Sequence, residues 1–269
     1  MSGHFARLDA LDFPDFAPGT VWLVGAGPGA PGLLSLLGYH AIGQADAIVY
    51  DALVSEQLLA LADPSAEKLY AGKRGGKPSE KQADISLRLV ELARAGRRVL
   101  RLKGGDPFMF GRGAEECAAL IAAKIPFRIV PGITAGIGGL AYAGIPATSR
   151  DTNHAVIFLT GHDETGGIPA AVDWAAIANA APVIVMYMAV KHLGSIAEKL
   201  IAAGRPPSDP LAVVIEASLP SQRIVRGTLG SVAAMAPDLA APAIVVLGPA
   251  SGLVDLDWYV AALRENRLG

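Results

Sequence analysis

Cysteine is nearly missing from this chain, because Cys117 is the single one among 269 residues. One thiol cannot form a disulfide within the chain, so we expect a reducing, cytoplasmic environment. Metal-ligand spacing is missing as well, since the histidines stand apart and Cys117 has no Cys or His three or four positions away. The sequence therefore predicts no metal site, and Cys117 is typical of a buried helix residue.

An excess of charge of one sign is also missing. The formal net charge is −2 and only 18% of the residues are charged. This balance argues against a general nucleic-acid binder and against a protein that lies on a membrane surface. The hydrophobic content of 52% is enough for one large or two ordinary domains, each with its own core.

One long stretch carries no charge and could be mistaken for a membrane span. Residues 129–149 are long enough to cross a bilayer. However, Pro131 and Pro146 interrupt the stretch and no aromatic belt flanks it. We expect a buried loop–helix–loop between domains and no membrane partner. Residues 1–18 lack an apolar signal-peptide core, and we expect them to form a flexible N-terminal extension.

Apolar runs alternate with helical patterns along both halves of the chain. This alternation predicts an α/β fold of two serial domains, with βαβ units and a parallel sheet in each. The predicted strands cover residues 20–24, 46–50, 66–70, 97–102, 126–130, 154–160, 182–188, 211–216 and 243–248. The predicted helices cover residues 33–44, 81–95, 113–123, 173–179, 191–203 and 228–235. We place an N-terminal α/β domain at 19–132, a bridge at 133–152 and a C-terminal α/β domain at 153–269.

The first predicted strand runs into a glycine-rich loop, Gly25-Ala26-Gly27-Pro28-Gly29-Ala30. The spacing fits the dinucleotide fingerprint, and Asp51 could be its acidic residue. In a dinucleotide site, a helix begins within the glycine triplet and receives the pyrophosphate. Here Pro28 and Pro31 interrupt that segment, so we expect the helix to start at or after Pro31. A nicotinamide site and a purely structural turn both stay open at this point.

Two further loops follow predicted strands. The segment "RVLRLKGGDPFMFGRGAEE" (98–116) combines Gly104-Gly105, which free the backbone, with apolar side chains, and would suit a ligand with an apolar ring and an amino-acid-like end. The loop "YAGKRGGKPSEKQ" (70–82) is basic, and Lys103, Arg112, Arg128 and Arg150 follow near strand or loop ends. Cations gathered at strand ends attract a small polyanion. The alternatives are a turn that caps the core and a solvated loop.

Together these segments resemble one family, the tetrapyrrole methylases that use S-adenosylmethionine, and within it the uroporphyrinogen-III C-methyltransferases. The segments that carry the resemblance are "GAGPGAPGLLSL" (25–36), "VYDALVS" (49–55), "GKRGGK" (72–77), "RLKGGDPFMFGRGAEE" (101–116), "PGITAGIGGLAYAGIPATSR" (131–150), "TGH" (160–162), "YMA" (187–189) and "QRIVRGTL" (222–229). The resemblance spans about residues 20–250, and "GKRGGK" with "GGDPFMFGRGAEE" is its specific part.

The resemblance implies a cofactor and substrate cleft between the two domains. It implies that S-adenosylmethionine, with S-adenosylhomocysteine as product, contacts Pro28, Gly104, Gly105, Asp106, Met109, Thr134, Ala135, Met188 and Ala217. Asp51 matches a proton acceptor, and Lys73 a proton donor or carboxylate partner. Arg112 and Arg150 match substrate clamps. A homodimer is also implied.

The implied reaction is the methylation of uroporphyrinogen III, a reduced tetrapyrrole rich in carboxylates, at C-2 and C-7. The product is precorrin-2, formed by way of precorrin-1, which leads to sirohaem or cobalamin. Other readings stay open: an NAD(P)-dependent oxidoreductase that uses Gly25–Ala30, a methylase of a later corrin precursor, and a tetrapyrrole carrier without catalysis.

Overall fold

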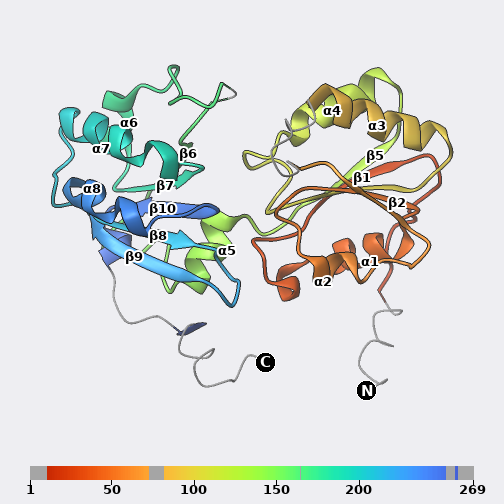
Figure 1. The fold of residues 1–269 in the computed structure, drawn as a ribbon, viewed down its shortest axis with the longest axis horizontal. Coiled ribbons are helices and arrows are strands. Elements are labelled where there is room, and N and C mark those ends of the chain that lie inside the picture. The colour runs from red at the N-terminus through yellow and green to blue at the C-terminus, as the bar shows by residue number, and fades with distance from the viewer. Residues whose placement is uncertain (1–10, 73–81, 164, 253–257, 260–269) are drawn as a thin grey trace. The chain divides into compact units, whose positions relative to one another are not determined.

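The structure is a computed structural model that describes residues 11–72, 82–163, 165–252 and 258–259. Lys73 and the rest of the basic loop up to residue 81 lie outside the described residues. The chain divides into two compact units. Unit 1 holds the chain up to Gly27 and Pro31–Ile133, and unit 2 holds Pro28–Ala30 and the chain from Thr134 onward (Figure 1).

Unit 1 is built on a parallel sheet with the strand order β3-β2-β4-β1-β5. Its strands are β1 (Val21–Gly25), β2 (Ala47–Tyr50), β3 (Glu67–Tyr70), β4 (Val99–Lys103) and β5 (Phe127–Val130). Its helices are α1 (Leu36–Gln44), α2 (Glu56–Leu59), α3 (Gln82–Arg94) and α4 (Gly113–Ala122), with a 3-10 turn η2 at Pro31–Leu33. The predicted strands of this half are confirmed, and α2 is an addition to the predicted helices.

The helices of unit 1 cover both faces of its sheet (Figure 1). Side chains alternate along each strand, so that Trp22 and Val24 pack toward α1 and α2 while Val21 and Leu23 pack toward α3 and α4. Because both faces are covered, β1 and β2 contain no charged residue. The edge strands β3 and β5 carry exposed charges at Glu67, Lys68 and Arg128. In β4, by contrast, Arg101 and Lys103 are buried on the face of α3 and α4.

The sheet of unit 2 has the strand order β6-β7-β10-β8-β9. Its strands are β6 (Val156–Thr160), β7 (Val183–Tyr187), β8 (Pro210–Ile215), β9 (Arg223–Thr228) and β10 (Ala243–Leu247). Only the β6–β7 pair among these described strands is parallel, and the other three pairs are antiparallel. The prediction of a parallel sheet in this half is therefore wrong. The edge strand β9 was not predicted, because its residues are only half buried and give a weak apolar signal.

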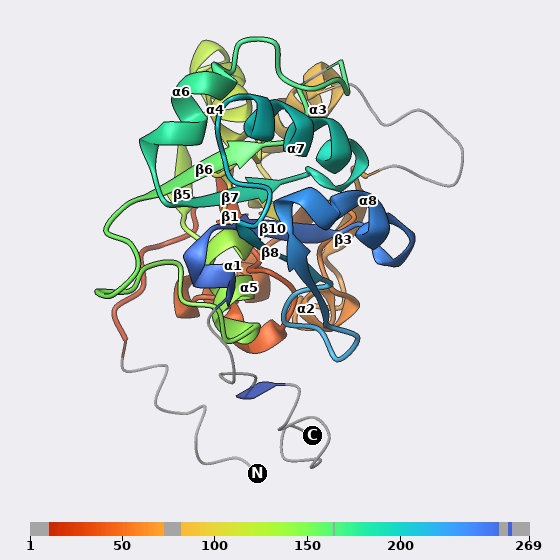
Figure 2. The ribbon, with the colours of Figure 1, turned by 90° about the vertical axis from the view of Figure 1, so that its left-hand side faces the viewer.

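Helices flank both faces of this second sheet (Figure 2). They are α5 (Ala135–Tyr142), α6 (Trp174–Ala180), α7 (Leu193–Ala202) and α8 (Val232–Met235), with 3-10 turns η3 (Val190–His192), η4 (Leu229–Ser231), η5 (Ala236–Asp238) and η6 (Pro249–Gly252). Helices α6, α7 and α8 share one apolar core with the sheet, whereas α5 contacts β7 and β10. Helix α5 is the helix expected within the uncharged stretch.

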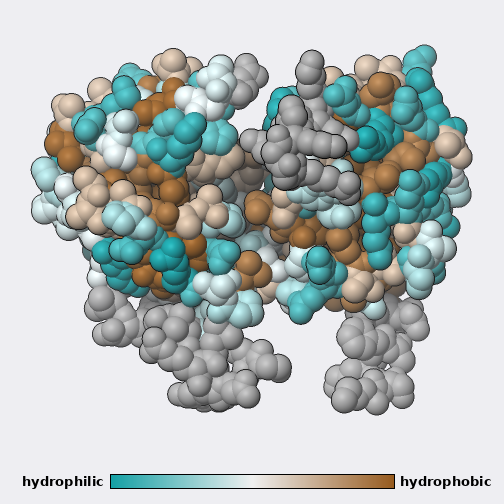
Figure 3. All heavy atoms as spheres, in the orientation of Figure 1, coloured by the Kyte–Doolittle hydropathy of each residue, from teal (hydrophilic) through white to brown (hydrophobic). Residues whose placement is uncertain are grey.

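Part of the N-terminal segment is packed against unit 1. Phe16 is 1% exposed and stacks on Trp22, and Phe13 stacks on His40. On the face shown in Figure 3, apolar and polar side chains are interspersed over both units. None of the helices formed by the described residues has the length and apolar character that a membrane crossing requires.

Candidate functional site

Four glycines of unit 1 bring the ends of three strands into backbone contact. A Cβ atom on Gly25 would lie 2.5 Å from both the carbonyl oxygen of Gly105 and the Cα of Gly132. Gly27 and Gly105 exchange two backbone hydrogen bonds, with N–O distances of 3.2 and 2.7 Å. The loops after β1, β4 and β5 therefore meet only because these positions lack side chains.

The contact between Gly27 and Gly105 shows the structural role of the first glycine loop, Gly25–Ala30. Helix α1 begins at Leu36, capped by the Ser35 hydroxyl, and only the short turn η2 precedes it at Pro31–Leu33. The prediction that the helix starts at or after Pro31 is confirmed. A dinucleotide site needs a helix N-terminus within the glycine triplet. Gly25 and Gly27 instead hold the loop of β1 against the loop of β4, which does not fit a nicotinamide site.

The loop after β4 is fixed by the carboxylate of Asp106. Its Oδ1 accepts from the backbone N–H of Phe108 at 2.8 Å, and its Oδ2 accepts from that of Gly132 at 2.9 Å. One carboxylate thus shapes the turn that contains Met109 and also holds the end of β5, two residues before Thr134. Phe108 on this loop is 55% exposed. One short segment, held in place by these hydrogen bonds, contains four predicted cofactor residues: Gly104, Gly105, Asp106 and Met109.

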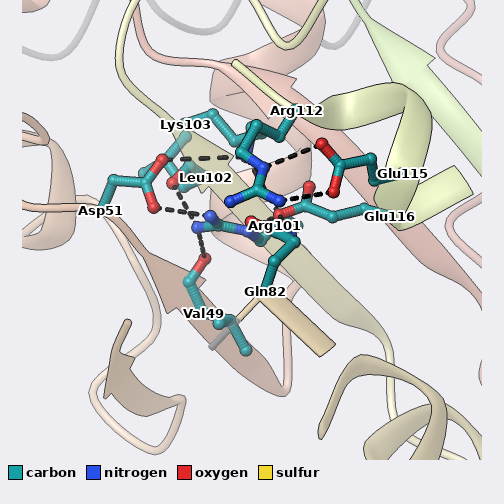
Figure 4. A network of polar contacts seen from close by, with 9 residues as sticks. All are labelled: Val49, Asp51, Gln82, Arg101, Leu102, Lys103, Arg112, Glu115 and Glu116. Carbon is teal, nitrogen blue, oxygen red and sulfur yellow. Dashed lines mark hydrogen bonds and ion pairs between the residues drawn. The ribbon is translucent and has the colours of Figure 1, made fainter. Parts of the chain in front are cut away.

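Asp51 lies at the end of β2 and is tied to two cations of β4 (Figure 4). The Arg101 guanidinium donates from Nη2 to Asp51 Oδ1 at 2.5 Å, and Lys103 Nζ lies 3.9 Å from Asp51 Oδ2. The Asp51 side chain is 31% exposed, while those of Arg101 and Lys103 are 2% and 3% exposed. Asp51 is therefore a partly solvent-accessible carboxylate whose cationic partners, Arg101 and Lys103, are buried in the interior of unit 1.

A second carboxylate, Glu116 of α4, balances these cations from the interior. Its Oε1 accepts from Arg101 Nε at 2.9 Å, from Lys103 Nζ at 3.0 Å and from Gln82 Nε2 at 3.0 Å. Its Oε2 has no hydrogen-bond partner among the described residues. Burial, and then the charge of Arg101, lower the pKa of Lys103. Two cations and two carboxylates thus form a neutral cluster, as buried charges require.

This cluster corrects part of the sequence prediction. The sequence places Lys103 among the cations that attract a polyanion, but it is buried against Glu116. It places Arg128 at a strand end, but Arg128 lies within β5 with its guanidinium 5.1 Å from the Trp22 ring centre. Lys103 is buried because it lies in a strand that is covered on both faces, whereas Arg128 is exposed near the start of the edge strand β5.

The proposed substrate clamps differ in their surroundings. Arg112 precedes α4 in a left-handed conformation, with φ at 59°, and pairs with Glu115 through two hydrogen bonds of 2.8 and 2.7 Å. Arg150 is exposed in the turn between Ser149 and Asn153. Lys73 lies outside the described residues.

In unit 2, the start of α5 is fixed to the end of β7. The Tyr187 hydroxyl lies 2.7 Å from Thr134 Oγ1 and accepts from the backbone N–H of Gly136 at 2.9 Å. Thr134 is buried and is the first residue before the helix. The predicted residues Thr134 and Ala135 are therefore positioned by the strand that leads directly to Met188.

Left-handed backbone marks the other predicted positions of unit 2. Met188 has φ at 54° and is 41% exposed, and Ala217 lies between Glu216 and Ser218, with φ at 49° and 65°. Such conformations in residues other than glycine are uncommon and concentrate at functional sites. A Cβ on Gly139 of α5 would lie 2.7 Å from the Cβ of Ala217, so α5 adjoins both strand ends.

Sequence reasoning missed Arg101 and Glu116. The signal was available in "RVLRLKGG", where two cations alternate with leucines in a strand that had to be buried. Such cations need carboxylates nearby, and "AEE" offers two candidates. Which of Glu115 and Glu116 faces inward depends on the rotation of α4, and only the structure decides this.

Two sequence predictions remain, one for Cys117 and one for metal binding. Cys117 is a free thiol buried in α4, as predicted, and burial raises its pKa. Within the described ranges, the His, Cys, Asp and Glu side chains form no group of three or more that could hold a metal ion.

Comparisons with known proteins show which family the chain resembles over most of its length. Residues 20–233 match the family model of the tetrapyrrole (corrin/porphyrin) methylases. The chain is 59% identical to a uroporphyrinogen-III C-methyltransferase of Sinorhizobium sp. over 98% of this chain and 93% of that one. It is 46% identical to a siroheme synthase of Tolumonas auensis over 93% of this chain, but it spans only 53% of that relative's length.

A solved structure extends the likeness to the fold. The uroporphyrin-III C-methyl transferase from Thermus thermophilus, complexed with S-adenyl homocysteine, matches with a TM-score of 0.77 and 39% identity, and the match covers 87% of this chain and all of that one. The family model covers most of the chain and the Sinorhizobium relative covers nearly all of it. The chain therefore belongs to the tetrapyrrole (corrin/porphyrin) methylases.

Proposed function

We propose that this chain is an S-adenosylmethionine-dependent C-methyltransferase that methylates uroporphyrinogen III at C-2 and C-7, giving precorrin-2 by way of precorrin-1. The observation that carries the proposal is the 59% identity to a uroporphyrinogen-III C-methyltransferase over 98% of the chain. The solved relative that contains S-adenyl homocysteine supports the choice of methyl donor.

The residues of the two units fit this cofactor chemically. In unit 1, Gly104 and Gly105 follow β4 and let its loop pack closely, since a Cβ on Gly104 would lie 2.9 Å from the Cβ of Leu53 and the backbone of Gly105 is hydrogen-bonded to that of Gly27. In unit 2, Ala135 at the start of α5, Met188 after β7 and Ala217 after β8 offer small or apolar side chains, suited to an apolar ring. We propose that these residues, with Pro28, Asp106, Met109 and Thr134, hold the cofactor.

The proposed chemistry asks little of the protein beyond positioning and proton transfer. When bound, S-adenosylmethionine supplies a methyl group that its sulfonium charge already activates. The chain must align an electron-rich pyrrole carbon with that methyl group and keep water out. Each transfer would form one carbon–carbon bond to the macrocycle while the methyl–sulfur bond breaks, with S-adenosylhomocysteine as the leaving group, and would release one proton from the macrocycle. We propose that Asp51 accepts this proton and that Lys73 acts as proton donor or carboxylate partner.

Asp51 is suited to this task by its setting. Its Oδ1 is held by Arg101, and nearly a third of the side chain is exposed. One oxygen therefore fixes the orientation of the carboxylate while the group stays accessible to a proton donor. Arg112 and Arg150 are proposed to bind carboxylates of the macrocycle, because a guanidinium matches a carboxylate in charge and geometry.

We also propose that the chain works as a homodimer in the cytoplasm. The family resemblance suggests the dimer. The single cysteine suits a reducing compartment.

An anaerobic incubation with uroporphyrinogen III and S-adenosylmethionine labelled in its methyl group tests the proposal. We expect label at C-2 and C-7 of the product, identified by mass spectrometry and carbon NMR. Label at other carbons, or transfer only to a later corrin precursor, would reassign the substrate. An absence of transfer to any tetrapyrrole would overturn the proposed function.

A further inference from the structure

Ser218, next to the proposed cofactor residue Ala217, is the centre of a hydrogen-bond network in unit 2. Its hydroxyl accepts from the backbone N–H of Ala30 at 3.0 Å, and its own N–H donates to Gln222 Oε1 at 2.7 Å. Ser218 is 1% exposed and has φ at 65°. A buried residue in this strained conformation keeps it only where its neighbours impose it.

The same network reaches the first glycine loop. A Cβ on Gly29 would lie 2.9 Å from a methyl carbon of Leu219 and 3.2 Å from the carbonyl oxygen of Ala217. The backbone of Pro28–Ala30 therefore lies directly against residues 217–219. Ser218 thus joins the segments of two proposed cofactor residues, Pro28 and Ala217.

Two aromatic residues near the C-terminus complete this network. The Tyr259 hydroxyl donates to the carbonyl oxygen of Ser218 at 2.8 Å, and Tyr259 is 7% exposed. Its ring packs edge-on against Tyr142 of α5, with the ring centres 4.7 Å apart. Trp258 beside it donates from Nε1 to the carbonyl oxygen of Ala141 in α5 at 2.9 Å. The Trp258 residue is 47% exposed. The two neighbours make similar bonds to different segments.

We propose that Tyr259 is a positioning residue for cofactor binding: its hydroxyl fixes the peptide of Ser218, and through it the loop of Ala217 and the segment Pro28–Ala30. This inference rests on the proposed function, since it takes Ala217 and Pro28 as cofactor contacts. Burial raises the pKa of the Tyr259 phenol, so the hydroxyl keeps the proton that it donates. Ser218 is then held on its N–H, its hydroxyl and its carbonyl oxygen at once.

The experiment compares Tyr259→Phe with Trp258→Phe. Each variant removes one hydrogen bond of the C-terminal aromatic pair and keeps an aromatic ring, but only Tyr259→Phe removes the bond to Ser218. Calorimetric titration with S-adenosylhomocysteine is run on wild type and on both variants, well below their melting temperatures. Steady-state kinetics give KM for S-adenosylmethionine and for uroporphyrinogen III separately.

We expect Tyr259→Phe to raise the Kd for S-adenosylhomocysteine about three- to tenfold, as for the loss of one buried hydrogen bond. KM for S-adenosylmethionine should rise with it, while KM for uroporphyrinogen III stays unchanged. Trp258→Phe should keep the wild-type Kd. A residue with a merely structural role would lower the melting temperature and leave the Kd unchanged.

The outcomes separate this inference from the function on which it rests. If wild type binds S-adenosylhomocysteine and Tyr259→Phe binds it equally well, the positioning role is overturned and the proposed function stands. An equal loss of affinity in both variants also overturns it, since the effect would then not pass through Ser218. If wild type itself does not bind, the proposed function fails and this inference fails with it.

Discussion

The Arg101 guanidinium joins two carboxylates of different exposure, donating to Asp51 at 2.5 Å and to Glu116 at 2.9 Å (Figure 4). Asp51 is partly open to solvent, whereas Glu116 is completely buried. The same buried cation therefore connects the proposed proton acceptor to the interior of unit 1. Replacing Asp51 should affect turnover, whereas replacing Glu116 should affect stability, and the two effects can be measured separately.

Replacing Asp51 with alanine should reduce turnover about a hundredfold or more and leave the affinity for S-adenosylhomocysteine unchanged. The reason is that the variant loses the proposed proton acceptor but none of the proposed cofactor contacts. Steady-state kinetics under anaerobic conditions and calorimetric titration measure the two quantities. Asp51→Asn, which keeps an oxygen for Arg101, should lose activity as well. Wild-type turnover in either variant would remove Asp51 from the mechanism.

Replacing Glu116 with glutamine should destabilise the protein by about 3 kcal/mol, because Arg101 and Lys103 then stay buried with too little negative charge. Glu115→Gln is the matched control: it is the same substitution one residue earlier, on a side chain that is 53% exposed. The control should change the free energy of unfolding by about 1 kcal/mol or less. Urea unfolding measures both. Equal effects would contradict the role given to the buried cluster.

Replacing Gly105 with leucine should abolish binding of S-adenosylhomocysteine. Gly105 has φ at 66°, a conformation that leucine strains, and its backbone packs against Gly25 and Gly132 in the proposed cofactor loop. Gly96→Leu is the control, since Gly96 has φ at 77° and a Cβ added there would meet no atom within 4 Å. Both variants bear similar backbone strain, so calorimetric titration isolates the effect of the loop. Native affinity in Gly105→Leu would place the cofactor elsewhere.

Asp46 should contribute to stability at neutral pH and lose this contribution in acid. Hydrogen bonds from the Arg98 side chain hold the pKa of Asp46 below its usual value of 3.8. The folded state therefore favours the ionised form, and the stabilisation is complete above that value and is lost as the pH falls through the lower, folded pKa. Because the side chain is 36% exposed, the effect should be modest.

Urea midpoints measured from about pH 7 down to about pH 2.5 follow this change. Asp46→Asn should be less stable than wild type at neutral pH, and the difference should shrink in acid. Arg98→Gln should remove the same contribution, so the double variant should be destabilised by less than the sum of the two single effects. A constant difference at every pH would contradict the assignment.

Local sequence patterns predicted much of the molecule. The alternation of apolar runs and helices located the strands of unit 1, because β1 and β2 are short apolar segments bounded by turn residues and β4 and β5 are mostly apolar. Proline positions predicted where α1 could begin, since proline lacks the N–H that a helix interior needs. The segments around Gly25 and Gly104 were singled out because their glycines and prolines require special backbone geometry, and the segment around Thr134 because it carries no charge and matches the family.

The direction of strands was not predictable in this way. An apolar run has the same composition whether its neighbour lies parallel or antiparallel to it, so the mixed sheet of unit 2 could not be read from β8 and β10. Charged side chains were equally ambiguous. The sequence did not distinguish Lys103, which is buried against Glu116, from Arg112, which is 49% exposed beside Glu115 and remains a proposed substrate clamp.

The sequence by itself determined the class of fold, the loops that carry the proposed cofactor residues, and the family. Each of these can be recognised from short segments: apolar runs, glycine and proline positions, and motifs shared with the family. Only the tertiary structure decided which side chains meet. It paired Arg101 with Asp51 and brought Tyr259 to Ser218, 41 residues away. Contacts of this kind depend on how distant segments pack, and packing is a property of the whole folded chain that no short segment contains.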